Sequence, residues 1–328
     1  MSVNRHDILI AFDVTNGNPN GDPDAGNMPR IEPNSGKGLV SDVCLKRKVR
    51  NFVALLQPKP TTDNQFGIFI QQGKILNDEI EKGIDAVAAP APEGEGGKKG
   101  KRTKTTDSGV NVAEQAVKYL CKTFYDVRTF GGVLSIGDDV LKGSAYGQVR
   151  GPVQFTLGMS VDPITTQELT VTRCAVTKKD DAPKGRTMGH KHIVPYGLYV
   201  AKAFVSPLFA KNTGFDDGDL ELFFDALCHM FSNDQSAARA EMCVRAIYVF
   251  EHVGTQPTSN NGQNRREQEL GCAHAHKLFE TVHIKRNGNS DTTFPTAFTD
   301  YDMAPDEGWD VKGQHPKYPG VTLHRLVG

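Results

Sequence analysis

Hydrophobic residues alternate with other residues near the start of the chain. Ile8, Ile10, Phe12 and Val14 are separated by single residues, which is the period expected of a β-strand with one face on a core. The following segment, up to residue 38, is rich in Asn, Asp, Gly and Pro. These residues favour turns over helices and strand ladders. The start of the chain therefore predicts a strand followed by a long polar loop.

A helix is predicted directly after this loop, over residues 41–56, with Ser41 as its N-cap. Its apolar positions are spaced i, i+4, i+7, i+8 and i+11: Leu45, Val49, Phe52, Val53 and Leu56. Lys46 and Arg50 are four residues apart, so we expect them to share an exposed stripe with Arg47 beside it. Loop N–H groups next to fixed positive charges suit a run of phosphates.

The rest of the chain mixes helical and strand patterns. Helical spacing is found over 76–87, 111–126, 216–231 and 267–275, and β-rich runs over 147–156, 169–176, 192–205, 243–253 and 278–285. Residues 177–191 are polar and basic and separate two β-rich runs, which predicts a hairpin that reaches away from the body. The tail after residue 285 is rich in Gly and Pro and poorly periodic.

Length and composition indicate one large globular domain with insertions, or two domains. The chain has 328 residues, 23% charged and 38% hydrophobic, with a net charge of −1. It has no apolar run of membrane-spanning length and no signal-peptide pattern at its start, so we expect a cytoplasmic protein. Six scattered cysteines without a CxxC pair favour free thiols in a reducing compartment.

A basic segment lies in a linker predicted to be mobile over residues 90–107. Its bases are Lys98, Lys99, Lys101, Arg102 and Lys104. The linker has too little apolar content to offset its ordering entropy. It is either a solvated surface loop or a flexible finger that touches a phosphate backbone.

Other chemistry is possible, but the patterns are incomplete. Residues 16–27 resemble a calcium loop, yet position twelve is Asn27, where a bidentate Glu is needed. The pairs His190/His192 and His274/His276 lack a third ligand at fixed spacing. No cofactor or metal is therefore predicted. Phe130, close to Arg128, is either a core residue or a ring that stacks on a base.

Four segments taken together resemble one protein family. They are residues 12–23 (FDVTNGNPNGDP), 41–51 (SDVCLKRKVRN), 126–132 (DVRTFGG) and 189–199 (GHKHIVPYGLY). In this order they are similar to the backbone subunit of type I CRISPR surveillance (Cascade) complexes, the "Cas-seven" family, and most of all to its type I-C branch. The resemblance extends from residue 6 to about residue 285.

The resemblance implies an α+β fold: a modified RNA-recognition-motif core, which is a ferredoxin-like β-α-β-β-α-β sheet, with a helical insertion. It implies one domain over 1–328, the insertion at about 57–125 and a protruding β-hairpin thumb at about 169–205. Several copies would line up along a guide RNA, beside other Cascade subunits, and present it for pairing with target DNA. The family subunit is a scaffold and not an enzyme.

An alternative remains open, namely a metal-dependent or His-based ribonuclease acting on CRISPR RNA. The related type III backbone subunit cuts RNA with an aspartate in the loop after the first strand, where this chain has Asp22 and Asp24. The surrounding sequence matches the type I pattern. We therefore expect no catalysis.

The predicted RNA-binding residues follow from the resemblance and from local chemistry. In the resemblance, Ser41, Lys46 and Arg50 match positions that contact the RNA backbone. The full set is Asn16, Asn18, Asn20, Arg30, Ser41, Lys46, Arg47, Arg50, Arg128, Phe130, Gly131, Gly132, Arg186, Lys191 and His192. The five bases of the linker are predicted to contact DNA.

Overall fold

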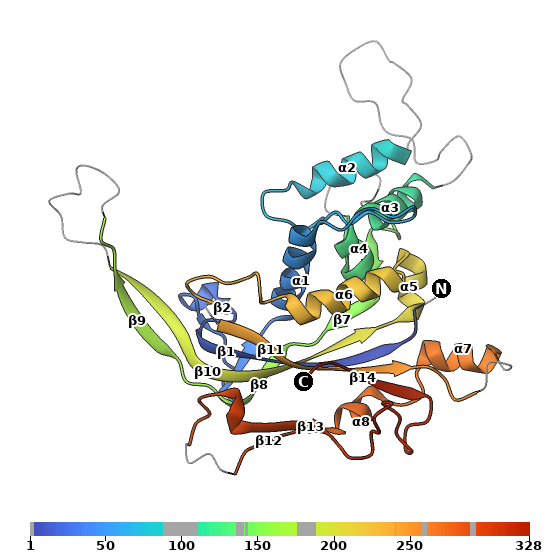
Figure 1. Ribbon diagram of the computed structural model, residues 1–328. Coiled ribbons are helices and arrows are strands. Elements are labelled where there is room, and N and C mark those ends of the chain that lie inside the picture. Colours follow the sequence, from blue (N-terminus) through green and yellow to red (C-terminus); the bar gives the residue numbers. More distant parts are fainter. Residues whose placement is uncertain are drawn as a thin grey trace.

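An antiparallel sheet forms the centre of the protein in the computed structural model (Figure 1). The structure describes residues 3–87, 111–135, 141, 144–175, 188–239, 241–256, 261–288 and 293–328. The strand order is β14-β11-β1-β10-β8-β4, and two further strands, β7 and β9, pair with β10. The strands are β1 (His6–Gly17), β4 (Lys37–Val40), β7 (Val153–Phe155), β8 (Gly158–Pro163), β9 (Gln167–Thr172), β10 (Met188–Val205), β11 (Glu241–His252) and β14 (Val321–Val327).

Strand β1 lies in the middle of this sheet and is buried on both faces. Ile8 and Ile10 belong to one hydrophobic core, whereas Leu9 and Ala11 belong to a second core on the opposite side. The sequence-based expectation of a strand with a single buried face is therefore wrong. The residues between the large apolar positions are themselves mostly apolar, which is typical of a strand covered on both sides.

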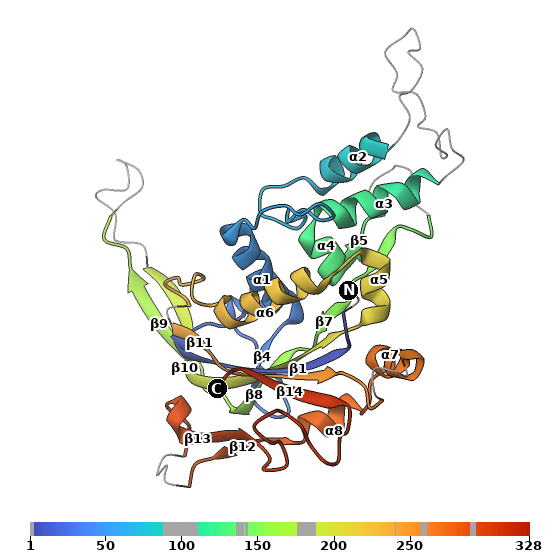
Figure 2. The same ribbon diagram turned by 45° about the vertical axis from the view of Figure 1, so that its right-hand side comes forward.

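Helices cover one face of the sheet (Figure 2). They are α1 (Asp42–Leu56), α5 (Pro207–Thr213) and α6 (Asp217–His229). Ser41 is the N-cap of α1, and its hydroxyl accepts a hydrogen bond from the backbone N–H of Cys44. Asp216 and Asp219 form a capping box at the start of α6. Helices α1 and α6 were predicted from sequence, within two residues at each end.

The C-terminal part of the chain covers the other face. It comprises α8 (Ala275–Phe279), β12 (Val282–Arg286), the 3-10 turn η3 (Phe298–Asp300) and β13 (Tyr301–Pro305), before β14 closes one edge of the sheet. Trp309 is 4% exposed in the second core. The single strand predicted over 278–285 is in fact the end of α8 followed by β12. Short elements joined by turns give no sustained periodicity, so the sequence showed little of this layer.

The segment from α2 to β6 has its own hydrophobic core. Its elements are α2 (Leu76–Val87), α3 (Val112–Thr123), α4 (Tyr125–Phe130), β5 (Gly131–Val133) and β6 (Gln148–Arg150). The helix predicted over 111–126 is interrupted at Phe124, whose backbone is extended. One further helix, α7 (Asn261–Leu270), follows β11. The linker 90–107, with Lys98, Lys99, Lys101, Arg102 and Lys104, lies outside the described residues.

A two-stranded ribbon projects from the sheet (Figures 1 and 2). It consists of β9 and the first part of β10, in a register that runs from Thr172 opposite Met188 to Gln167 opposite Ile193. The remaining residues of β10 pair with β1. Within the described ranges, no helix is long and apolar enough to cross a membrane.

Replacing Trp309 with Ala should lower the free energy of unfolding by about 3–5 kcal/mol, because it removes a large buried ring. The indole packs 5.5 Å from the Phe250 ring and donates a hydrogen bond of 2.9 Å to the Thr281 hydroxyl. Urea denaturation measures the change, with Trp309→Phe as a milder control. A loss below about 1 kcal/mol for Trp309→Ala would show that the C-terminal layer is not part of the cooperative core.

Candidate nucleic-acid interface

The polar loop between β1 and α1 is ordered by its own side chains. It contains β2 (Gly21–Asp22), the 3-10 turn η1 (Pro23–Ala25) and β3 (Met28–Pro29). The Asn18 side chain is 5% exposed and donates a 2.7 Å hydrogen bond to the Asn27 carbonyl. Asn20 accepts a 2.8 Å hydrogen bond from the backbone N–H of Ser41. Asn18 thus holds the loop together and Asn20 fixes it to the helix start at Ser41, whereas Asn16 is exposed.

Gly17, Asn18 and Asn20 of this loop each contact a different segment of the chain. Gly17 lies opposite Val194 in β10, three residues after Lys191. The backbone N–H of Asn18 donates a 2.6 Å hydrogen bond to the carbonyl of Ala238, beside Arg239. Asn20 holds the start of α1, as described above. The ribbon, the segment before β11 and the N-terminus of α1 therefore meet at residues 17–20.

Basic side chains that are exposed or half-buried lie on these converging segments. Arg47 is exposed on α1, and Arg30 is half-buried next to Asp22, 3.2 Å from its carboxylate. Lys191 and His192 are half-buried at the base of the ribbon. Together they give this end of the sheet several positive charges from separate elements.

Arg239 belongs to the same end of the sheet and was not predicted. Its guanidinium donates a 2.8 Å hydrogen bond to Asp234, which also pairs with the buried Lys48. The Arg239 side chain is 34% exposed. No local pattern marks it, because its position depends on a contact with Asn18 more than 200 residues earlier in the chain.

The stripe of α1 that contains Lys46 and Arg50 faces the protein and not solvent, which corrects the sequence-based expectation. Arg50 is 8% exposed and donates a 2.8 Å hydrogen bond to Asp126. The Lys46 ammonium contacts Asp42 at 3.2 Å and Gln154 at 2.9 Å. Periodicity identified the stripe but could not show that α4 and β7 cover it.

Phe130 is a core residue in this structure. It is 5% exposed, lies 6.3 Å from the Phe155 ring, and has the Arg50 guanidinium 5.2 Å above its own ring. Its ring is therefore inaccessible to a base.

Gly131 has a φ of +73°, and a Cβ there would lie 2.2 Å from the Val149 carbonyl oxygen, so the position requires glycine for backbone packing. Gly132 is half-buried, with open space where a Cβ would stand.

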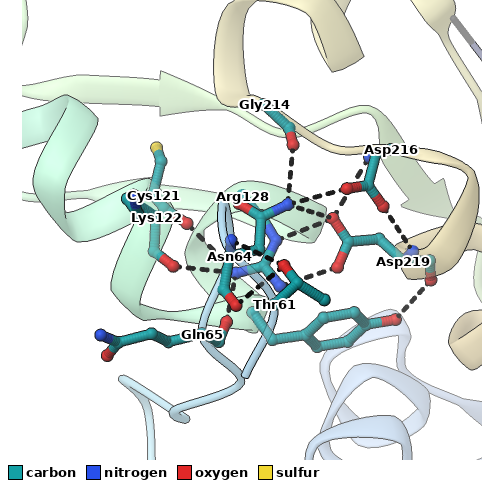
Figure 3. A network of polar contacts seen from close by, with 10 residues as sticks. Thr61, Asn64, Gln65, Cys121, Lys122, Arg128, Gly214, Asp216 and Asp219 are labelled. Atoms are coloured by element: carbon teal, nitrogen blue, oxygen red, sulfur yellow. Dashed lines mark hydrogen bonds and ion pairs between the residues drawn. The ribbon is translucent and has the colours of Figure 1, made fainter. Parts of the chain in front are cut away.

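Arg128 is fully buried, which is incompatible with the predicted contact to RNA. Its Nε and Nη2 donate hydrogen bonds of 2.8 and 2.7 Å to the two carboxylate oxygens of Asp219 (Figure 3). Its Nη1 donates to the carbonyls of Gln65 at 2.7 Å and Cys121 at 3.2 Å. Burial raises the pKa of Asp219, and the hydrogen bond from Arg128 opposes that shift. Arg128 thus supports the fold behind the interface.

The ribbon has two different faces, because residues directly opposite each other share a face. Leu169 lies opposite Lys191 and Val171 opposite Gly189 on one face. Glu168 lies opposite His192 on the other, where the Glu168 carboxylate is also 2.5 Å from His190 Nδ1. All six residues of β9 are exposed. Arg186 lies outside the described residues.

No three His, Cys, Asp or Glu side chains come together in the described part of the chain in a way that could hold a metal ion. In the suspected calcium loop, Asp22 accepts a 3.2 Å hydrogen bond from the backbone N–H of Asp24 and pairs with Arg30.

Comparison with known proteins identifies the family. The sequence profile of the family described as "CRISPR-associated protein Cas7" matches residues 4–306. The chain belongs to this family. A relative of the same description from Haloferax volcanii is 25% identical over 253 residues, which cover 74% of this chain and 68% of that protein. The resemblance drawn from four sequence segments is thereby confirmed at the level of the Cas7 family.

Two solved structures with a partial likeness to this chain were also found. A chain from "CRISPR RNA-guided surveillance complex, pre-nicking" has a TM-score of 0.46 and 17% identity, with 88% of this chain and 84% of that chain covered. A chain from "CRISPR RNA-guided surveillance complex" has a TM-score of 0.43 and 15% identity, with 84% and 80% covered.

Replacing Arg128 with Met should lower the free energy of unfolding by about 3–5 kcal/mol, because Asp219 is left buried without its partner. The double variant Arg128→Met/Asp219→Leu should recover most of this loss, since neither charge remains. Urea denaturation of both variants and the parent measures the difference. Equal destabilisation of the single and double variants would contradict the account, because it would mean that lost packing and not an unpaired charge is responsible.

Proposed function

We propose that this Cas7 protein is a guide-RNA-binding backbone subunit of a CRISPR surveillance complex, of the type I-C branch. Copies of it would polymerise along the guide RNA, beside other Cascade subunits, grip its phosphate backbone and present it for pairing with target DNA. The subunit itself would cut no nucleic acid. Family membership supports the proposal, and the geometry of the sheet narrows where the RNA can lie.

The order of elements agrees with a modified RNA-recognition motif. In chain order the central elements are β1, α1, β8, β10, α6 and β11, which is a β-α-β-β-α-β succession. In space the four strands are arranged β11-β1-β10-β8. Both helices pack on the same face of this sheet.

The proposed binding mode depends on one observation. The face of the sheet opposite to α1 and α6 is covered by the C-terminal part of the chain. An ordinary RNA-recognition motif stacks bases on aromatic residues of that face. Here Tyr248 and Phe250 lie in the second core under Leu278, Phe279 and Trp309. RNA cannot reach these rings, so we place it at the end of β1, against residues 17–20 and the surrounding cations.

This placement suits a scaffold that must accept any guide sequence. Arg30, Arg47, Lys191 and Arg239 can contact phosphates, which position a nucleic acid without reading its bases. We retain Asn16, Gly132 and His192 as possible contacts because they are at least partly accessible. Lys46 contributes only its remaining 13% exposed side-chain surface. The basic segment 98–104 remains a proposed contact for target DNA on the basis of its charge.

Replacing Arg47 with Gln should weaken guide-RNA binding by about 1 kcal/mol, equally for unrelated guide sequences, because a charge-assisted phosphate contact is lost. The dependence of log affinity on log salt should become shallower by about 0.7. Filter binding with labelled RNA at several salt concentrations measures both. Arg266→Gln, an exposed arginine on α7 far from this end, is the matched control and should change neither.

The same labelled RNA tests the ribonuclease alternative. Intact RNA after incubation, with and without a divalent metal, supports the scaffold. Cleavage that requires the purified protein would establish the enzyme instead. Unchanged affinity and salt dependence in Arg47→Gln would place the RNA elsewhere.

Replacing residues 177–191 with a Gly-Ser segment of equal length should leave a folded monomer that binds short RNA weakly and forms no ordered rows. The segment has five bases, Lys178, Lys179, Lys184, Arg186 and Lys191. Electron micrographs of the variant with a long guide RNA measure the assembly. Rows of normal length and spacing would show that another segment joins the copies.

A further inference from the structure

An open cavity of about 670 Å³ lies at the end of β1 opposite to residues 17–20. It is bordered by the start of β1, β11, β14, α6 and α7, near the end of the sheet where the N-terminus is marked in Figure 1. Its volume falls within the range typical of small-molecule sites. Nothing in the proposed RNA interface uses it.

Hydrogen-bond acceptors dominate the polar lining. Glu251 accepts hydrogen bonds from the Asn4 amide at 2.8 Å and from His324 Nε2 at 2.9 Å. Mainly because of the His324 hydrogen bond, the pKa of Glu251 is lowered to about 2, so the carboxylate is ionised at neutral pH. Asp217 and Glu221 add two more carboxylates to the lining.

His6 adds an acceptor of a different kind. His6 is only 5% exposed, and its Nδ1 donates a 2.9 Å hydrogen bond to the Asn4 carbonyl. Because a carbonyl only accepts, Nδ1 holds the proton and Nε2 of the neutral ring presents a lone pair. Burial lowers the pKa of His6, which favours this neutral form. Among the described residues, Nε2 has no hydrogen-bond partner.

The positive charge at the rim is already engaged. Arg265 lines the cavity, but its Nε donates a 2.8 Å hydrogen bond to Glu269. The remaining wall is apolar and consists of Leu220, Phe224, Val249 and Leu326. A ligand that fits must therefore combine several N–H donors and a positive charge with an aliphatic portion.

We propose that this cavity binds an amphipathic organic cation, namely a guanidinium or primary ammonium group on an aliphatic stem. The cation would donate hydrogen bonds to His6 Nε2 and to the carboxylates of Glu221 and Glu251, while its stem packs against Phe224 and Leu326. A guanidinium suits the site best, because it has five donors in a planar fork and is weakly hydrated.

Two sources share this chemistry: a free small cation, or a basic side chain of a second copy of the chain. The second source rests on the proposed function. The cavity is lined in part by α7 and the start of β1. These elements lie at the end of the sheet opposite to the ribbon (Figure 1). A contact between the cavity and the ribbon would be head-to-tail, and head-to-tail contacts build open rows when the rotation between copies does not close a ring.

Isothermal titration of the RNA-free protein with butylguanidinium tests the proposal, with the neutral isostere butylurea as the probe control. We expect saturable one-to-one binding of butylguanidinium and none of butylurea. Glu221→Gln should weaken binding at least fivefold, whereas Asp225→Asn, an equal charge change on an exposed residue of the same helix outside the cavity lining, should not. Absence of binding, equal binding of butylurea, or an unchanged affinity in Glu221→Gln would overturn the proposal.

Sedimentation velocity of the protein with guide RNA then identifies the source. If butylguanidinium dissociates assembled copies of the parent protein but not those of Glu221→Gln, a basic side chain of a second copy occupies the cavity. Unchanged assembly combined with binding in the titration would show a site for a free cation. Because the titration contains no RNA, failure of the RNA-binding proposal leaves its result interpretable.

Discussion

The buried ion pair between Arg128 and Asp219 is the constraint on which the arrangement of the helices depends. An unpaired charge at either position would be costly in a site with no exposure to water, so α4 and α6 must meet with both side chains in place. The carbonyls of Gln65 and Cys121 accept hydrogen bonds from Arg128 Nη1 and draw the segments that carry them to the same point. The orientation of α4 then places Phe130 beneath Arg50 and so fixes the inner side of α1. The outer side of α1, with Arg47, is left facing solvent.

Sequence predicted the elements better than it predicted the roles of their side chains. The apolar spacing of α1 and α6 and the cap at Ser41 are local signals, and the structure confirms them. Whether a cation is exposed depends on partners elsewhere in the chain. Arg50 pairs with Asp126, 76 residues away, and Arg128 pairs with Asp219, 91 residues away. Because these partners are distant in sequence, both arginines were predicted to contact RNA. The same lack of local signal concealed Arg239 and the C-terminal layer.

The closed face of the sheet connects fold and function. The poorly periodic tail packs Trp309 and its neighbours over the surface on which an ordinary RNA-recognition motif would stack bases. What remains accessible is the end of β1, where backbone contacts at residues 17–20 gather the loop, the helix start and the ribbon. The residues assigned to that surface include Arg30, Arg47, Lys191 and Arg239 but no exposed aromatic platform. That combination favours gripping the backbone of any guide over recognising particular bases.

Hydrogen exchange measured by mass spectrometry, with and without guide RNA, tests the placement of the RNA most directly. The account predicts slower exchange in peptides covering residues 16–47, 188–194 and 232–239 when RNA is bound. Peptides of the opposite layer, over 275–286 and 301–309, should exchange at the same rate in both samples. Protection of 275–286 and 301–309, with no change at residues 16–47, would show that the RNA binds the C-terminal face and would contradict the account.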